Sequence, residues 1–463
     1  MKAMGRSLKA CGLFLAALGA GLALGGSACG QGAAPAGDDQ LVKELVKQNS
    51  VLVERVQALE ARLSTVEQGG AESASRLKQL ELLKELKASN ANGAAVLSSS
   101  FDDVRFKLYG YLKTDAAYMG ARANSNDAPC YMLSPSAAGV FKHDGQFSMT
   151  ARQSRLGLFI DGPKVEGWDV RGRIEADFYN GVNAEVDETR TTPRLRLAYI
   201  EISKPETLIR VGEDWDVAAP LNPDTINYGI LNYGGNLGYR RVQARLTQRI
   251  ALDAEKKYLW IVEGSINRPQ GEGGGTDEGV DSGLPLLEGR TALRFPGWTK
   301  QPIEVGLSGS WSKEEYDSAT VNAVHSFASW SANADWSVPL TEQWSWKGEF
   351  FTGRNLDQLM GGINQGVNGA LWRGIRDTGG WTQLSFSPTD KWTFNGGIGI
   401  DNPCDGDLSA TMRSYNHIIY ANVIYKISKQ LQVGLEVSDL KTDYIQQRTG
   451  EALRVQGAVW YYF

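Results

Sequence analysis

The chain has 463 residues, of which 22% are charged, and a formal net charge of −5. Its mean hydropathy of −0.30 excludes a protein built from transmembrane helices. The mildly acidic balance also argues against a nucleic-acid partner, because phosphate contacts need a concentrated positive surface. The 13 tryptophans and 17 tyrosines favour a chain that meets a membrane interface, where such rings accumulate.

The first 36 residues have the features of a secretory signal. Three cations precede an apolar run from Cys11 to Gly25, which is too short to span a bilayer as a helix. Removing those cations changes the formal charge from −5 to −8. Cleavage is expected after Ala36, with Ala28 as a second site, and lipidation of Cys29 is a less favoured alternative.

Residues 38–87 are predicted to form an α-helical coiled coil in the periplasm. Apolar residues recur at gaps of three and four, and Asn49 takes one inward position, as in coiled coils whose register a polar residue fixes. The apolar positions are Val42, Leu45, Leu52, Val56, Leu59, Leu63 and Val66. A single amphipathic helix lying on the protein or the membrane is the alternative. Residues 88–103, rich in Ala, Ser and Asn, are expected to be a linker.

From residue 104 to 463 the pattern changes to alternation with a period of two. Short connections such as Lys204 to Thr207 alternate with long, glycine-rich ones such as Gly120 to Gly145. This predicts an all-β transmembrane barrel of about 16 antiparallel strands, with the short turns on the periplasmic side. The last segment, Val455 to Phe463, alternates and finishes on an aromatic ring, which is typical of a closing barrel strand.

Charged residues alternate with apolar ones on four consecutive predicted strands. Arginine or lysine facing lipid at mid-bilayer costs about 2–4 kcal/mol, so these charges are expected to face the lumen. On the second of these strands this puts Leu195, Leu197 and Tyr199 on the lipid face. The predicted pore-lining residues are Arg171, Arg173, Arg194, Arg196, Arg210, Arg241, Arg245 and Arg249, and Arg290 and Arg294 add two more further round.

An arginine wall in a narrow pore attracts anions and can grip a carboxylate through two parallel hydrogen bonds. The same segments also contain acidic residues, which are Glu175, Asp177, Glu201, Asp214 and Asp216. Two interpretations stay open: an anion-selective wall, or a neutralised wall with general permeability.

The stretch from Val217 to Asn236 is long and carries a single charge. It is expected to fold into the lumen as a constriction, with Asn222 and Asp224 opposite the arginines; a disordered surface loop is the alternative. The segment from Asn355 to Gly374 is a second candidate for a plug.

Two cysteines remain in the predicted barrel, Cys130 and Cys404, and both fall in predicted extracellular loops. An oxidising compartment allows them to form a disulfide, and two free thiols are an equal alternative. No Cys-x-x-Cys or histidine-rich spacing suggests a metal site, and no cofactor is expected.

The middle of the chain resembles a known family. The segments Gly212 to Asp216 (Gly-Glu-Asp-Trp-Asp) and Pro220 to Pro223 (Pro-Leu-Asn-Pro), placed after a heptad segment and before an aromatic terminal strand, are similar to the DcaP-like trimeric porins of Gram-negative outer membranes. The resemblance implies a sixteen-stranded barrel, a homotrimer with an N-terminal coiled coil, and a preference for small anions such as dicarboxylates.

These observations predict an outer-membrane porin for passive diffusion of small hydrophilic solutes. Its expected partners are outer-membrane lipid, small anionic solutes, two further copies of the chain, and peptidoglycan or a periplasmic protein at the coiled coil. An envelope tether anchored by the barrel is the alternative. No enzyme is expected, because His143, His325 and His417 lie on distant segments without a serine-centred motif.

Overall fold

The computed structural model of the chain describes residues 104–180, 191–269, 278–318 and 323–463. All of them belong to one compact unit, Lys84–Phe463. The predicted signal (1–36), coiled coil (38–87) and linker (88–103) lie outside the described residues and stay predictions. In the described part of the chain, no helix is long and apolar enough to cross a membrane.

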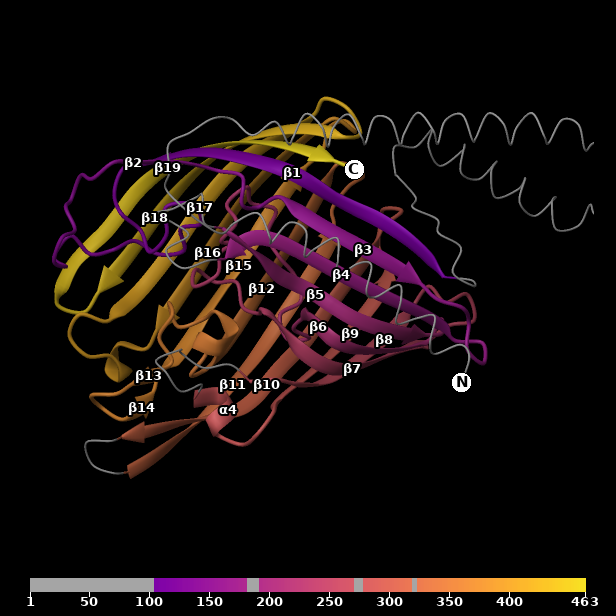
Figure 1. The fold of residues 1–463 in the computed structure, drawn as a ribbon, viewed down its shortest axis with the longest axis horizontal. Helices are drawn as coiled ribbons and strands as arrows, with labels where there is room; N and C mark the ends of the chain where they lie inside the picture. Colours follow the sequence, from indigo (N-terminus) through magenta and orange to yellow (C-terminus); the bar gives the residue numbers. More distant parts are fainter. Residues whose placement is uncertain (1–103, 181–190, 270–277, 319–322) are drawn as a thin grey trace, which may run out of the picture. The chain divides into compact units, whose positions relative to one another are not determined.

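The unit is built from antiparallel strands joined by turns and loops (Figure 1). The first are β1 (Arg105–Met119), β2 (Gln146–Thr150), β3 (Arg155–Asp161), β4 (Asp169–Asn180), β5 (Thr192–Ser203), β6 (Thr207–Trp215), β7 (Arg240–Ala251), β8 (Leu259–Asn267) and β9 (Leu286–Pro296), with a short helix α4 (Glu278–Asp281) before β9. They continue with β10 (Pro302–Ser318), β11 (Ala323–Pro339), β12 (Trp344–Arg354), β15 (Arg376–Phe386), β16 (Trp392–Pro403), β17 (Arg413–Lys426), β18 (Leu431–Tyr444) and β19 (Gln447–Tyr462). The loop after β12 contains the 3-10 helix η2 (Asp357–Leu359) and the small hairpin of β13 (Val367–Asn368) and β14 (Arg373–Gly374), and η3 (Asp405–Asp407) follows β16.

The sheet closes on itself as a barrel. Consecutive strands pair with each other, and β1 pairs with β19, which places Tyr111 opposite Tyr462. Figure 1 shows β19 beside β1. β2 and β3 both pair with β1, at its two ends, so they are two halves of one span interrupted at residues 151–154. The 17 strands of the sheet therefore make sixteen spans, which confirms the predicted closed antiparallel barrel.

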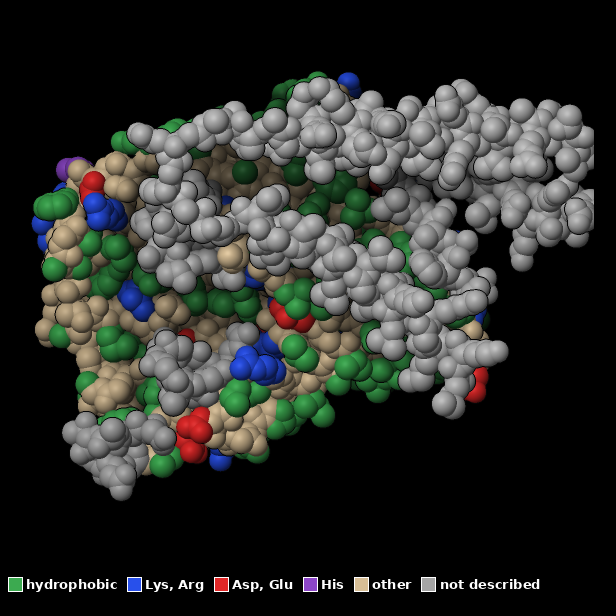
Figure 2. All heavy atoms as spheres, in the orientation of Figure 1, with side chains coloured by type: hydrophobic (Ala, Val, Ile, Leu, Met, Phe, Trp, Pro, Cys, Tyr) green, Lys and Arg blue, Asp and Glu red, His purple; other side chains and the backbone are tan. Residues whose placement is uncertain are grey.

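Side chains on the strands are sorted in the opposite way to a water-soluble protein. On β7 the apolar Val242 and Leu246 are each 52% exposed, whereas Gln243 and Thr247, the residue that follows each of them, are buried. A barrel wall in lipid requires this order, with apolar residues outward and polar residues inward. Figure 2 shows hydrophobic side chains over much of the visible barrel surface.

A hydrophobic core lies inside the barrel, where loops meet the wall. In one cluster Met132 and Leu231, from two different loops, pack with Trp381 on β15 and Ile418 on β17. Gly235 shows how close this contact is, because its φ is +111° and a Cβ there would lie 2.2 Å from the carbonyl oxygen of Gly380. Only glycine fits such a close approach.

One predicted orientation was wrong. Leu197 and Tyr199 were expected to face lipid, but Leu197 is 3% exposed and the Arg210 guanidinium lies 4.3 Å from the centre of the Tyr199 ring. The cause is a register shift between β4 and β5, where Glu175 pairs with Leu197 and the next residue pairs with Leu195. Such a bulge inserts one residue and reverses the alternation beyond it.

Candidate functional site

The segment Val217 to Asn236 runs inside the barrel along the inner wall. Its backbone N–H groups donate to inward side chains of five strands, taken in the order of the sheet, which satisfies donors that burial would otherwise leave unpaired. The donor–acceptor pairs are Val217 to Glu288 on β9 (2.8 Å), Ala219 to Ser308 on β10 (3.2 Å), Leu221 to Glu349 on β12 (2.7 Å), Asp224 to Gln383 on β15 (2.6 Å) and Ile226 to Glu436 on β18 (2.6 Å). We call this segment the inner loop.

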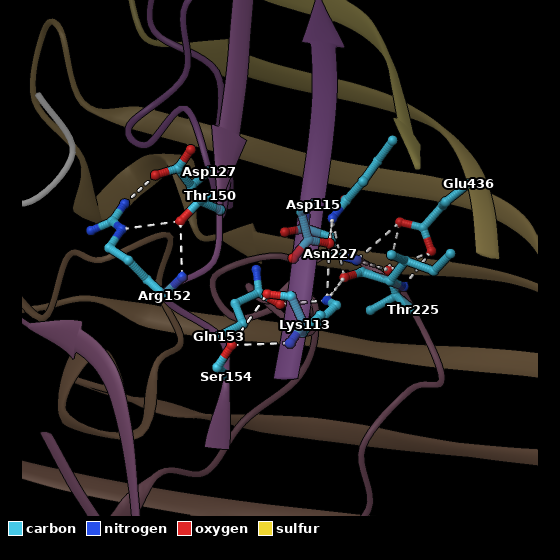
Figure 3. A network of polar contacts seen from close by, with 12 residues as sticks. Lys113, Asp115, Asp127, Thr150, Arg152, Gln153, Ser154, Thr225, Asn227 and Glu436 are labelled. Carbon is cyan, nitrogen blue, oxygen red and sulfur yellow. Dashed lines mark hydrogen bonds and ion pairs between the residues drawn. The ribbon is translucent and has the colours of Figure 1, made fainter. Parts of the chain in front are cut away.

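The far end of the inner loop is fixed by the polar network of Figure 3. Glu436 accepts hydrogen bonds from the Thr225 hydroxyl (2.8 Å) and from the Asn227 backbone (3.3 Å). The Lys113 ammonium on β1 donates to the carbonyl of Ile226 (3.1 Å) and pairs with Asp115 (3.1 Å). Most of these groups are buried, so they hold the loop rather than meet solutes.

The same network extends to the break between β2 and β3. Arg152, which lies in that break, pairs with Asp127 from the loop after β1, and Asp127 in turn accepts from Arg454 through its backbone carbonyl (3.0 Å). The segment 120–145 is thereby drawn into the barrel mouth as well.

Asn222 and Asp224 lie on the part of the inner loop next to β12 and β15. The Lys347 ammonium donates to the Asn222 carbonyl (2.8 Å) and pairs with the Asp224 carboxylate (2.8 Å). Asp224 keeps 53% of its side chain exposed. Counted along the closed sheet, β15 is eight spans from β5, which is half of the circumference. The carboxylate and the arginines of β5 are therefore attached to opposite sides of the barrel.

The arginines of β4 and β5 share two buried carboxylates. Asp177 accepts from Arg194 (2.8 and 3.0 Å) and Arg196 (2.9 Å), and from the hydroxyl of Tyr228 on the inner loop. Glu175 accepts from Arg196 (2.9 Å) and Arg173 (3.0 Å). Arg173 and Arg194 keep about a quarter of their side chains exposed, whereas Arg196 is buried.

The arginines of β6 and β7 are also largely paired. Arg210 contacts both Glu201 and Asp214, and Arg245 contacts the Trp215 carbonyl, with Asp214 at 3.8 Å. Arg241 is fully buried; it pairs with Asp216 (2.7 Å) and donates to the carbonyl of Gln358 in the loop after β12 (2.8 Å).

Two predicted arginines lie at the rim of this wall. Arg171 is the most exposed of the paired arginines on β4–β7 and reaches Asp161 at 3.4 Å. Arg249 has no side-chain ion pair within the described ranges.

Sequence alternation missed Arg240, the residue before Arg241. Both are buried, because Arg240 opens β7 directly after the inner loop. Its guanidinium lies over the rings of Trp215 (5.0 Å) and Tyr239 (4.8 Å), and it has no carboxylate partner in the part of the chain that the structure describes. It forms no ion pair there, but it lies within electrostatic range of Arg196, Arg194 and the Glu213 carboxyl. The adjacent arginines Arg240 and Arg241 were visible in the sequence. Strict alternation along a strand lets only one of two neighbours face inward, so it selected Arg241 and missed Arg240.

The segment from Asn355 to Gly374 also enters the barrel mouth. Its η2 turn is buried. The Leu359 carbonyl accepts a hydrogen bond from the Gly238 N–H (2.8 Å), and the Met360 carbonyl accepts one from the Tyr233 N–H of the inner loop (2.8 Å).

Outside the membrane-spanning segments, the Arg376 guanidinium beside Asp407 lowers the pKa of that carboxyl to about 2. Asp407 therefore stays charged in mildly acidic solution and keeps its ion pair with Arg373 (3.1 Å).

Cys130 and Cys404 are not joined by a disulfide in the structure. Cys130 is buried in the barrel mouth, where a Cβ on Gly229 of the inner loop would lie 2.9 Å from its sulfur. Cys404 instead accepts from Arg376 at the end of β15 (3.2 Å). The two sulfur atoms therefore have different neighbours, which the sequence did not show. Within the described ranges, no cluster of His, Cys, Asp and Glu could hold a metal ion.

Several solved structures share this fold. The outer membrane channel DcaP of Acinetobacter baumannii matches with a TM-score of 0.62 and 18% identity, over 79% of this chain and 99% of that one. Salmonella typhi OmpF, solved with daunomycin, matches with a TM-score of 0.51 and 11% identity, over 80% of this chain and all of that one. An anion-selective porin from Comamonas acidovorans matches with a TM-score of 0.50 and 12% identity, over 78% of this chain and all of that one.

No curated protein matches the sequence. A family model described as DcaP outer membrane protein matches residues 39–287, which is more than half of the chain and includes the arginines of β4–β7 and the inner loop. With the closed sixteen-span barrel, this match identifies an outer-membrane channel protein: the chain belongs to the DcaP outer membrane protein family.

Proposed function

We propose that the chain is a passive porin that favours small anions, such as dicarboxylates, and that it has no catalytic activity. The observation that carries the proposal is the charge of the inner wall formed by β4 to β7. These strands contain nine arginines and six carboxylates, a surplus of three positive charges that Asp216 reduces to two. A positive surplus in a confined, water-filled space favours anions over cations.

The placement of the surplus matters more than its size. Arg240, Arg249 and the exposed part of Arg171 are the positive groups least neutralised by their neighbours. Across the barrel, Asp224 leaves part of its carboxylate exposed beside Lys347. A solute that passes between the two sides would meet guanidinium groups on one side and a single carboxylate on the other. The exposed quarter of Arg173 and of Arg194 can still donate a charge-assisted hydrogen bond to a carboxylate.

The extensive ion pairing supports a weak selectivity. Arg194, Arg196 and Arg210 each contact carboxylates on their own or adjacent strands, so much of their field is cancelled. We therefore expect both ions of a salt to pass, with anions favoured a few-fold.

The test is the reversal potential of the purified protein in a planar bilayer under a salt gradient. A potential of the sign for anion flow, reduced by a dicarboxylate on one side, supports the proposal. A potential near zero would mean that the wall is neutralised and that permeability is general. Absence of conductance would favour the envelope tether. The three loops in the barrel mouth would then block the lumen of the barrel.

The proposal includes a homotrimer, with residues 38–87 forming a periplasmic coiled coil that contacts peptidoglycan or another envelope component. Amine crosslinking of native membranes tests the oligomer directly. A ladder that ends at two copies, or a monomer alone, would contradict it.

A further inference from the structure

The outer wall of β12 and β15 ends in two facing arginines on the side of the long loops. Arg354 is the last residue of β12, Arg376 is the first of β15, and the register places them directly opposite each other. Alternation along β12 puts Arg354 on the same outward face as the well exposed Phe350. Like charges directly opposite each other destabilise a strand pair, and an anion between them would remove that cost.

These arginines have few acidic partners. Arg354 forms no ion pair with the described residues, and its Nε is buried without a hydrogen-bond acceptor there. Arg376 pairs with Asp407 (2.7 Å), which Arg373 of β14 shares (3.1 Å). Asp405, in the same turn as Asp407, is exposed and forms no ion pair within the described ranges. Three guanidinium groups therefore share one paired carboxylate, and Arg354 keeps an unused donor.

The two facing arginines lie at the edge of the membrane-facing wall. Trp344 opens β12 at the short-turn end, where its ring stacks on that of Phe386 (4.4 Å between the centres). The strand is 11 residues long and closes on Arg354. At about 3.3 Å per residue and a tilt of about 40°, its two ends differ in height by roughly 25 Å, which is the height of the apolar band of such a barrel. Arg354 and Arg376 therefore lie at the level of the lipid headgroups on the long-loop side.

Away from the loops, the outward side chains below the arginines become first hydroxylated and then apolar. Thr352 and Thr378 are the next outward residues on the two strands, with their hydroxyl oxygens 3.0 Å apart. Further along, Phe350 on β12 and Leu384 on β15 are 49% and 42% exposed. This order of cations, hydroxyls and apolar groups matches the phosphate, the polar linkage and the acyl chains of one lipid molecule. A free phosphate would leave the apolar part of the wall without a role.

We propose that Arg354 and Arg376, with Arg373 beside them, form a binding site for the phosphate group of a lipid in the outer leaflet. The site lies on the outside of the barrel, so it does not depend on the proposed anion preference of the lumen. Guanidinium groups bind phosphate oxygens through paired, charge-assisted hydrogen bonds. A phosphate between the facing arginines offsets their repulsion and gives the Arg354 Nε an acceptor. The bound lipid then holds together both ends of the loop 355–375, which enters the barrel mouth.

The test titrates the full-length protein in non-ionic detergent micelles with lipid A, a glycolipid that carries two phosphates, and counts bound lipid by native mass spectrometry. Arg354→Gln is the main variant, because it breaks no ion pair among the described residues. Arg354→Lys keeps the charge, and Arg354→Gln combined with Arg376→Gln removes the facing pair. The matched control replaces Arg122 and Arg448, exposed arginines elsewhere on the long-loop side, with Gln. Gel migration without heating shows that each variant is folded.

Arg354→Gln should weaken lipid A binding about tenfold, which corresponds to the loss of one charge-assisted hydrogen bond. The double variant should bind still more weakly, Arg354→Lys should retain part of the affinity, and the control should bind as the original protein does. Lipid A stripped of its phosphates should bind no better than lipid A binds to the double variant.

Three results would overturn the site. Equal binding by the original protein and Arg354→Gln would exclude Arg354 from it. Equal binding of lipid A with and without its phosphates would show that only the acyl chains are held. Displacement of lipid A by millimolar inorganic phosphate would show a site for small anions instead of a lipid.

Discussion

Two sides of the same barrel use their buried charges differently. On β4 to β7, arginines pair with carboxylates of the same wall and leave several guanidinium groups partly exposed. On β12 to β18, Glu349 and Glu436 form no ion pair with an arginine of the described strands; they accept hydrogen bonds from the backbone of the inner loop. The first wall therefore keeps partly exposed positive groups, whereas the second fixes the position of the inner loop. A count of charges would not distinguish these two roles.

The largest expected effect separates the two neighbouring arginines at the start of β7. Arg241→Gln should lower the free energy of unfolding by about 3–5 kcal/mol, because it leaves Asp216 buried and unpaired. Arg240→Gln is the matched control: it loses only ring contacts, worth about 1 kcal/mol, since it has no carboxylate partner in the described ranges. Urea unfolding in detergent micelles, followed by tryptophan fluorescence, measures both. Equal losses of unfolding free energy in the two variants would show that the ion pair between Arg241 and Asp216 stabilises the fold no more than the ring contacts of Arg240 do.

The second prediction concerns the wall that holds the loop. Glu436→Gln should loosen the inner loop by about 2 kcal/mol, because several donors lose a charged acceptor. Single-channel recordings should then show larger and noisier currents. Glu451→Gln, on the exposed face of β19, removes the same charge away from the loop and should leave the current unchanged. The same current in all three proteins would mean that the inner loop does not limit conduction.

The third prediction tests the field of the arginine wall. Replacing Arg171, Arg173 and Arg245 together with Ala should shift the permeability ratio toward cations about fivefold, since each charge contributes about 0.3–0.5 kcal/mol in water after screening. The shift should shrink at high salt. A matched control replaces Lys164, Lys256 and Lys257, which lie exposed in the short β3–β4 and β7–β8 turns. An unchanged reversal potential in the arginine variant would establish the neutralised wall.

The smallest effect belongs to the carboxylate across the lumen. Asp224→Asn removes one exposed negative charge and frees Lys347, so anion preference should rise by about twofold. Asp390→Asn, in the turn between β15 and β16, is the control with the same loss of charge. A shift toward cations, or equal shifts in both variants, would place Asp224 outside the permeation path.

The sequence by itself determined the barrel. Alternation of charged and apolar residues is a local property, because successive side chains of a strand must point to opposite faces and lipid rejects ions on one of them. It therefore predicted the sixteen spans and marked Arg173, Arg194 and Arg210 as inward. It failed where the alternation is broken, at Leu197 and Tyr199 beyond the β5 bulge and at Arg240 beside the inner loop.

The tertiary structure decided which inward charged side chains are paired within the protein and which stay partly exposed. Glu175 and Asp177 lie near Arg173 in the sequence, but their partners Arg194 and Arg196 come from the next strand, and Tyr228 comes from the inner loop. Glu436 receives the backbone of a loop 210 residues away, and the Cys130 sulfur lies beside Gly229 of the inner loop instead of forming a disulfide with Cys404. These contacts join distant segments through the closed wall, so no local pattern could reveal them. The physical reason is that pairing depends on distance in space, which only the register of the barrel and the path of its loops fix.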